Sequence, residues 1–172
     1  MSAKTPTPAV LILGATSLIG GYLARELAET GTAFTQISRN PAPLDRSWLR
    51  ADLTDADLAA RLPATALVYS LSPIWLLPDA LPALKAAGMK RLVAFSSTSV
   101  FTKAASSEPS ERAVAARLAE AEAAAAAFCA ANGVAWTILR PTLIYDEGHD
   151  GNVSRLAALI RRFGLLPVSG KG

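Results

Sequence analysis

The chain has 172 residues, of which 51% are hydrophobic and 18% charged, and its formal net charge at pH 7 is +3. This length allows one domain with a sizeable core and is too short for two ordinary ones. The composition argues against a disordered chain, and the scattered lysines and arginines argue against a nucleic-acid-binding face. The single cysteine, Cys129, permits no internal disulfide and is expected to be a buried apolar residue.

The N-terminal segment MSAKTPTPAV has no long apolar stretch followed by a small-residue cleavage site, so it does not read as a signal peptide. No stretch elsewhere approaches the roughly 18 uninterrupted apolar residues of a membrane span. We therefore expect a cytoplasmic protein that binds neither membrane nor nucleic acid.

Apolar runs of strand length alternate with helix-length segments along the whole chain. The first run, AVLIL, is continuous, as in a strand that is buried on both faces. Thr54 and Ser110 suit the N-cap position of two of the helices. The expected strands are Ala9–Leu13, Ala33–Ser38, Trp48–Ala51, Ala66–Ser70, Arg91–Ser96 and Val134–Leu139. The expected helices are Leu18–Thr30, residues 54–62, Pro78–Ala87, Ser110–Asn132 and Val153–Phe163.

This alternation predicts an α/β protein, in which parallel strands are joined by crossover helices. With right-handed crossovers, the expected architecture is a doubly wound parallel sheet in the strand order 3-2-1-4-5-6. Ligands of such sheets bind where the strand order reverses, here beside the first strand.

The stretch LILGATSLIGGYL crosses from the first strand into the first helix and contains a glycine-poor version of a phosphate-binding turn. Gly14 suits the tight turn, and Gly20 suits close packing of helix on strand, whereas Ser17 stands where a middle glycine is usual. The helix N-terminus favours a phosphate group. We expect this loop to hold a dinucleotide pyrophosphate, through Gly14, Thr16, Ser17, Leu18, Ile19 and Gly20.

The end of the second strand predicts the type of cofactor. Ser38 and Arg39 stand where an acidic residue would bind the 2′-hydroxyl of NAD, and both can bind a 2′-phosphate. NADP(H) is therefore the preferred cofactor and NAD(H) the alternative. Asp52 and Leu53, after the third strand, are expected at the adenine, although Asp52 also suits a helix entry. The end of the fourth strand is expected to add Ser70 and Leu71.

The loop GATSLIGGYL, the pair Asp52-Leu53 and the stretches VAFSSTSVF and WTILRPTLIY occur in the order found in one family. Together they resemble the NAD(P)-dependent epimerase/dehydratase family, the extended and atypical short-chain dehydrogenases/reductases. The likeness extends from Val10 to about Gly172. It implies a Rossmann fold and hydride transfer at a carbonyl or sugar substrate.

The resemblance also implies catalytic residues, and here the chain departs from the pattern. Thr98 matches the residue that hydrogen-bonds the reacting oxygen of the substrate. The usual Tyr-x-x-x-Lys pair is absent, and Ala113 and Arg117 stand at its two positions. Arg117 can hold a ribose or phosphate, but Ala113 transfers no proton. Two functions therefore stay open: an oxidoreductase or nucleotide-sugar epimerase/dehydratase, and a non-catalytic NADP(H)-binding sensor, regulator or assembly protein.

Two further expectations concern the C-terminal third. The family continues beyond a segment like LPVSGKG into a substrate-binding region, so residues 1–172 are expected to be one cofactor-binding domain cut before that region. The apolar surface left open would favour a homo-oligomer. The loop Asp146–Asp150, DEGHD, holds the only histidine, but its adjacent side chains cannot all turn to one ion, so no metal site is expected.

Overall fold

The computed structural model describes residues 9–41, 47–146, 150 and 153–164. Its strands are β1 (Ala9–Leu13), β2 (Phe34–Ser38), β3 (Trp48–Arg50), β4 (Thr65–Ser70), β5 (Arg91–Phe95) and β6 (Ala135–Leu139). Its helices are α1 (Leu18–Glu29), α2 (Leu58–Arg61), the 3₁₀ turn η1 (Ile74–Leu76), α3 (Leu77–Ala86), α4 (Ser99–Thr102), α5 (Pro109–Ala131) and α6 (Val153–Phe163).

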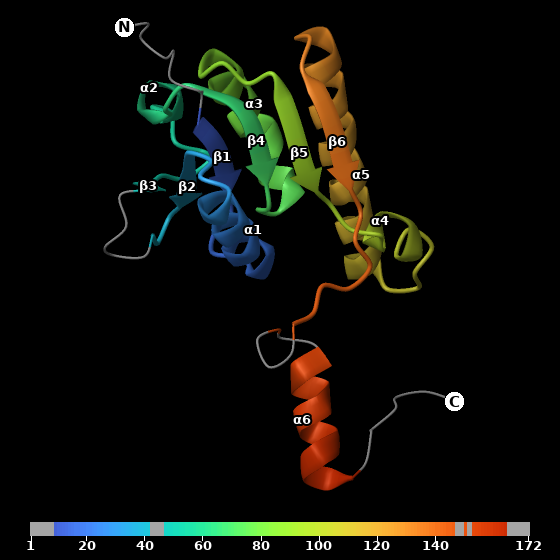
Figure 1. Ribbon diagram of the computed structural model, residues 1–172. Helices are drawn as coiled ribbons and strands as arrows, with labels where there is room; N and C mark the ends of the chain where they lie inside the picture. The colour runs from blue at the N-terminus through green and yellow to red at the C-terminus, as the bar shows by residue number, and fades with distance from the viewer. Residues whose placement is uncertain (1–8, 42–46, 147–149, 151–152, 165–172) are drawn as a thin grey trace, which may run out of the picture. The chain divides into compact units, whose positions relative to one another are not determined.

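The six strands form one parallel sheet in the order β3-β2-β1-β4-β5-β6 (Figure 1). The predicted fold class and strand order are therefore confirmed, and the strand bounds agree with the predicted ranges to within one residue. β2 and β3 follow β1 on one side of it in the sheet. The chain then crosses back, and β4, β5 and β6 follow one another on the other side of β1. The carboxyl ends of β1 and β4 thus flank the point of reversal.

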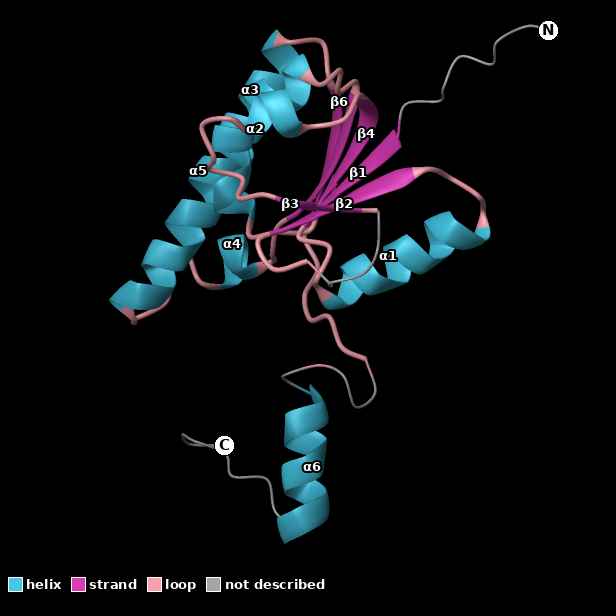
Figure 2. Ribbon diagram, turned by 90° about the vertical axis from the view of Figure 1, so that its left-hand side faces the viewer, coloured by secondary structure: helices cyan, strands magenta, loops and turns pink. Residues whose placement is uncertain are grey.

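Helices cover the sheet from both sides, with α1 on one face and α2, α3 and α5 on the other (Figure 2). On the α1 side, Val10 and Ile12 pack against Leu23 and Leu27. The opposite side holds the larger core, which includes Leu11, Leu13, Val68, Leu81, Leu84, Leu92, Leu118 and Ala125. The apolar side chains from Val10 to Leu13 in β1 are buried because both faces of this strand are covered.

Cys129 lies in this larger core with no exposed surface. Burial raises the pKa of its thiol above the ordinary value, which keeps the side chain neutral. The expectation of a buried apolar cysteine is confirmed.

Both predicted N-caps are wrong, for local reasons. The N–H and hydroxyl of Thr54 bond to Asp52 Oδ1 at 3.1 and 2.9 Å, so the chain turns there and α2 begins only at Leu58. The helix α5 begins one residue early, at Pro109, because proline suits the first helical position and keeps the preceding Glu108 extended. The short helix α4 was not predicted.

The chain divides into a unit that ends at Thr142 and contains the whole sheet, and a second unit, residues 143–172, that contains α6. Within the second unit, α6 has the predicted bounds, and Gly164 follows it with φ of +63°. In the described part of the chain, no helix combines the length and apolar character needed to cross a membrane.

Candidate functional site

Gly14 makes the turn that carries β1 into α1. Its φ is +71°, a conformation that L side chains rarely adopt. A Cβ atom on Gly14 would lie 2.5 Å from the backbone nitrogen of Ser72 and 2.8 Å from the carbonyl carbon of Leu71. The turn after β1 therefore lies directly against the loop that follows β4, and only glycine fits between them.

Gly20 lets α1 approach the turn closely. A Cβ atom there would lie 2.3 Å from the carbonyl oxygen of Ala15, whereas one on the neighbouring Gly21 would meet nothing within 4 Å. Of the two adjacent glycines, Gly20 is thus the one that the packing requires.

Ser17 occupies the N-cap of α1 with φ of −71° and ψ of 161°, an extended conformation open to any residue. No glycine is needed there, which accounts for the departure from the usual spacing. Its Oγ accepts a hydrogen bond from the Gly20 N–H at 3.2 Å. The hydroxyl proton of Ser17 remains available for donation to an anion at the helix N-terminus, where the first N–H groups have no intrahelical acceptor.

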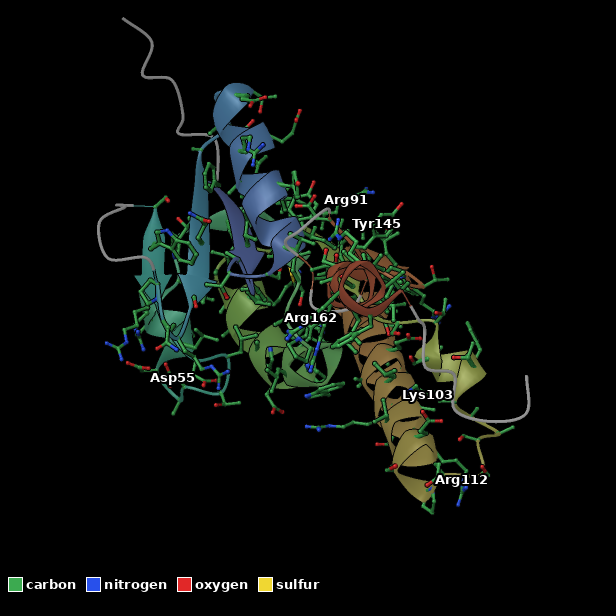
Figure 3. The ribbon with its side chains drawn as sticks, turned by 90° about the horizontal axis from the view of Figure 1, so that it is seen from below. Asp55, Arg91, Lys103, Arg112, Tyr145 and Arg162 are labelled. Atoms are coloured by element: carbon green, nitrogen blue, oxygen red, sulfur yellow. The ribbon has the colours of Figure 1, made fainter. Side chains whose placement is uncertain are left out.

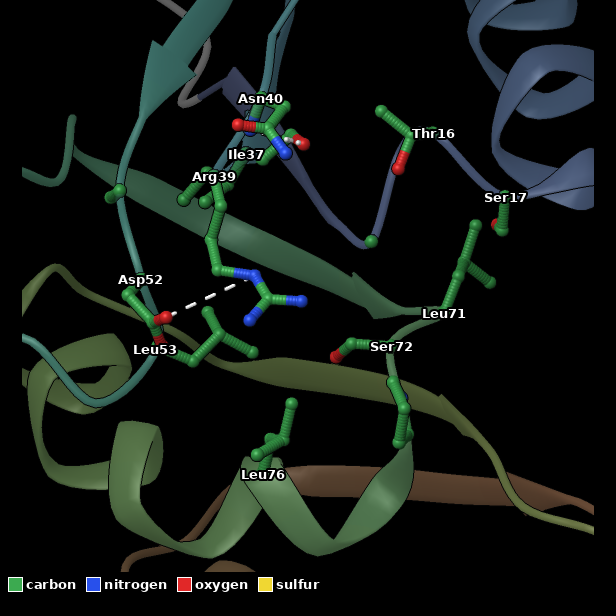
Figure 4. A pocket seen from close by; sticks show the side chains of 14 residues that line it. Thr16, Ser17, Ile37, Arg39, Asn40, Asp52, Leu53, Leu71, Ser72 and Leu76 are labelled. Carbon is green, nitrogen blue, oxygen red and sulfur yellow. Dashed lines mark hydrogen bonds and ion pairs between the residues drawn. The ribbon is translucent and has the colours of Figure 1, made fainter.

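A crevice of about 500 Å³ lies at the carboxyl ends of β1, β2, β3 and β4, at the reversal of strand order (Figure 4). Its volume is in the range of small-molecule sites in proteins. The lining residues are Gly14, Thr16, Ser17, Ile37, Ser38, Arg39, Asn40, Ala51, Asp52, Leu53, Leu71, Ser72, Pro73 and Leu76.

Most of the predicted cofactor residues line this crevice: Gly14, Thr16, Ser17, Ser38, Arg39, Asp52, Leu53 and Leu71. Leu18, Ile19 and Gly20 do not line it and belong to the first turn of α1 instead. Ser70 is also absent from the lining and is 1% exposed within β4. The prediction missed Ile37, Asn40, Ala51, Ser72, Pro73 and Leu76, although each lies next to, or within a few residues of, a strand end already singled out.

Ser72 is the most informative of the missed residues. In the described part of the chain, its hydroxyl oxygen is buried and has no hydrogen-bond partner. Its side chain lines the crevice (Figure 4), and its backbone lies against Gly14. A buried hydroxyl without a partner carries a free-energy cost, which a polar group bound in the crevice would remove.

Arg39 reaches from the end of β2 across the crevice toward Asp52 (Figure 4). Its Nε lies 3.9 Å from Asp52 Oδ2, and the Arg39 side chain is 75% exposed, so this ion pair is weak. The N–H and hydroxyl of Thr54 hold the pKa of the Asp52 carboxyl below its ordinary value. Asp52 is therefore ionised at neutral pH, and Oδ2 keeps the capacity to accept a hydrogen bond.

Thr98 and Arg117 lie outside the lining of the crevice. The N–H and the hydroxyl of Thr98 both donate to the Pro141 carbonyl, at 3.1 and 3.3 Å. The guanidinium carbon of Arg117 lies 4.4 Å from the centroid of the Trp75 ring. Arg117 and Trp75 belong to a separate hollow of about 290 Å³ between α5 and the segment of η1 and α3. The structure does not bring these two residues together with the glycine turn.

An ion pair between the buried Glu122 and the partly exposed Arg140 fixes the loop after β6, to which Thr98 is bonded. Glu122 of α5 is 6% exposed, and its Oε1 and Oε2 each lie 3.0 Å from Arg140 Nε. The Arg140 guanidinium also lies over the Phe101 ring, 5.1 Å from its centroid. The hydrogen bonds from Arg140 hold the pKa of Glu122 below its ordinary value, despite the opposing effect of burial. This pair joins α4, α5 and the β6 loop.

The described residues hold no cluster of histidine, cysteine and carboxylate side chains suited to a metal ion. Within the loop Asp146–Asp150, residues 147–149, including His149, lie outside the described part of the chain.

The profile of the NAD(P)H-binding family matches residues 14–159. No curated protein matches the chain. Among solved structures, MoeE5 in complex with UDP-glucose and NAD is 25% identical with a TM-score of 0.71, and the match covers 86% of this chain and 59% of MoeE5.

Two further solved structures share the fold at lower identity. The NAD-dependent NDP-hexosamine 5,6-dehydratase TunA, involved in tunicamycin biosynthesis, is 23% identical with a TM-score of 0.75, over 96% of this chain and 65% of TunA. UDP-glucuronic acid 4-epimerase from Bacillus cereus, in complex with UDP-glucuronic acid and NAD, is 18% identical with a TM-score of 0.75, over 95% and 66%. The chain thus spans between 59% and 66% of the length of these three proteins.

Proposed function

The chain belongs to the NAD(P)H-binding family, and from this membership we propose that its crevice binds NADP(H), with the pyrophosphate on the turn from Gly14 to Gly20. The observation that carries the proposal is the close approach of Gly14 to the Ser72 backbone at the point of strand reversal. Because of this close approach, the glycine turn, the hydroxyl groups of Thr16, Ser17 and Ser72, and the N-terminus of α1 adjoin one crevice. These groups are suited to binding a phosphate ester.

The side chains of the crevice fit the parts of a dinucleotide. Thr16 and Ser17 offer hydroxyl donors to the pyrophosphate, and the buried Ser72 hydroxyl gains a partner. Asp52 Oδ2 offers an acceptor to the exocyclic amine of adenine, beside the apolar Leu53.

Ser38 and Arg39 would bind the 2′-phosphate of the cofactor. Ser38 Oγ already accepts the Asn40 N–H at 3.1 Å and keeps its own proton for donation. Arg39 is largely exposed and held only by a 3.9 Å ion pair, so its guanidinium can turn to a phosphate at small cost.

We further propose that the chemistry is hydride transfer at a carbonyl or sugar carbon, by analogy with the epimerase and dehydratase structures that share the fold. A bound nicotinamide would supply or accept the hydride. Thr98 would orient the reacting oxygen, and Arg117 would lie near the cofactor. Because Thr98 donates to Pro141 and Arg117 lies on Trp75, both side chains would have to change partners.

A specific observation favours a second candidate, a sensor or scaffold that binds NADP(H) without turnover. Ala113 stands on α5 where the resemblance expects the proton-transferring tyrosine, and an alanine methyl group holds no proton to transfer. Cofactor binding alone would not need that residue.

Calorimetric titration with NADPH and NADH, followed by a turnover assay on carbonyl compounds and nucleotide sugars, tests the two candidates. We expect saturable binding of both cofactors, with NADPH bound about tenfold or more tightly, as one charge-assisted phosphate contact would give. Oxidation or reduction of the cofactor by the wild-type chain that is lost in Thr98→Ala would support the enzymatic function. No oxidation or reduction with any compound of the panel would favour the sensor function. No saturable binding of either cofactor at millimolar concentration would refute both.

A further inference from the structure

A second hollow, of about 340 Å³, adjoins the crevice at the edge of the sheet formed by β3. It shares Arg39, Ala51 and Asp52 with the crevice and adds Arg50, Asp55 and Arg61. Three arginines and two aspartates therefore line it, and the balance of formal charge is positive. The hollow is an extension of the proposed cofactor site toward the β3 edge.

One of its arginines is already fully engaged. Arg61 donates to Asp55 Oδ2 at 2.9 Å, to Asp57 Oδ1 at 3.3 Å and to the backbone carbonyl of Arg50. These contacts neutralise Asp55 and anchor the main chain at the end of β3. Asp55 Oδ2 also accepts the N–H of Asp52 at 2.9 Å, which leaves it little capacity to attract another cation.

Arg50 differs from Arg61 in this respect. Its side chain is exposed, and among the described residues its guanidinium has no ion-pair or hydrogen-bond partner. Asp52, the other aspartate of the hollow, bonds to Thr54 through Oδ1 and faces Arg39 with Oδ2. Arg50 is thus a cation available to a ligand.

The register of the sheet places Arg50 close to Arg39. The Cα atoms of Ser38 and Arg50 are partners across β2 and β3, so the two strands end side by side, about 4.8 Å apart. Arg39 is the next residue after Ser38. Two arginine side chains that start from neighbouring strand ends and line one hollow can both reach a single anion, and guanidinium groups suit the oxygens of a phosphate monoester.

We propose that Arg50 is a second determinant of selectivity for a 2′-phosphorylated cofactor: it binds the 2′-phosphate from β3 while Arg39 binds it from β2. This inference rests on the proposed NADP(H) site. The two arginines would share the dianionic group, and Arg61 would keep the β3 end in place through its contacts with Arg50 and Asp55.

Adenosine 2′,5′-bisphosphate and 5′-AMP test the proposal, because they differ only in the 2′-phosphate and lack the nicotinamide half. Their dissociation constants are measured by calorimetry for the wild-type chain, Arg50→Gln and Arg50→Lys. We expect Arg50→Gln to weaken bisphosphate binding about tenfold and AMP binding less than about twofold. Arg50→Lys should fall between wild type and Arg50→Gln, because it keeps the charge and loses the planar donor pair.

Arg91→Gln is the matched control for the loss of one positive charge. Arg91 is exposed at the amino end of β5, well apart from Asp55 and the β3 edge (Figure 3). The Arg91→Gln substitution should change the affinity for either ligand by less than about twofold. Far-ultraviolet circular dichroism of each variant checks that the fold is kept.

The outcomes separate this inference from the function on which it rests. A wild-type chain that binds neither ligand refutes both. Binding of AMP and bisphosphate with equal affinity keeps the adenosine site but refutes the 2′-phosphate contact and the role of Arg50. A preference for bisphosphate that persists unchanged in Arg50→Gln, or that Arg91→Gln reduces equally, refutes the role of Arg50 alone.

Discussion

Gly14→Ala is expected to lose NADPH binding and to lower the free energy of unfolding by about 2–5 kcal/mol. Two effects combine at this position. A positive φ of +71° is unfavourable for alanine, and the added Cβ would overlap the Ser72 and Leu71 backbone, which belongs to a second strand end and cannot simply rotate away. Separation of the two loops would disrupt the crevice that Gly14, Ser17 and Ser72 line together.

The matched control is Gly21→Ala, seven residues further on. It makes the same chemical change in α1, where a Cβ meets nothing within 4 Å. It should keep NADPH affinity and raise stability by up to about 1 kcal/mol, since alanine favours a helix over glycine. Urea denaturation and calorimetry measure both quantities. Wild-type affinity in Gly14→Ala would contradict the assignment of this turn as the phosphate site.

The second large effect is expected for Arg140→Met, which removes one partner of the pair with Glu122. The carboxylate would remain buried without its bidentate donor, and the free energy of unfolding at pH 7 should fall by about 3 kcal/mol. This is the lower end for a buried pair, because the Arg140 side chain is 40% exposed. The double variant Glu122→Leu/Arg140→Met should recover most of the loss, since apolar residues can replace such a pair at little cost.

The pH dependence of this loss follows from the lowered pKa of Glu122. A carboxyl group whose pKa is lower in the folded than in the unfolded state stabilises the fold above its ordinary value of 4.5, and this stabilisation is lost as the pH falls through the lower pKa. The difference between wild type and Arg140→Met should therefore shrink in acid. A difference that is absent at pH 7, or that grows below pH 4.5, would contradict the structural role of the pair.

The strands and their order could be predicted because each is a continuous apolar run between turn residues, and right-handed crossovers leave few topologies. Helix starts were less predictable. Thr54 and Ser110 are good capping residues. The Thr54 hydroxyl, however, donates a hydrogen bond to Asp52 Oδ1, and α5 already begins at Pro109, so that Ser110 lies inside the helix. Which of several neighbouring residues begins a helix depends on local backbone geometry, which composition does not specify.

The residues of the candidate site that could be predicted are those that closely follow the end of a strand. Gly14, Arg39 and Asp52 follow directly from their position after β1, β2 and β3. Ser72 was missed because its importance comes from the close approach of Gly14, 58 positions earlier in the chain. The pairing of Glu122 with Arg140 likewise depends on how α5 lies against the end of β6, and no local spacing indicates it.

The central claim is that the crevice at the carboxyl ends of β1 to β4 is the dinucleotide site. A titration of the ¹⁵N-labelled chain with NADPH, followed in amide correlation spectra, tests it most directly. We expect saturable shifts that concentrate on the amides of residues 14–20, 38–40, 51–53 and 71–72. Shifts confined to the hollow around Trp75 and Arg117, or no saturable shifts at millimolar NADPH, would contradict the claim.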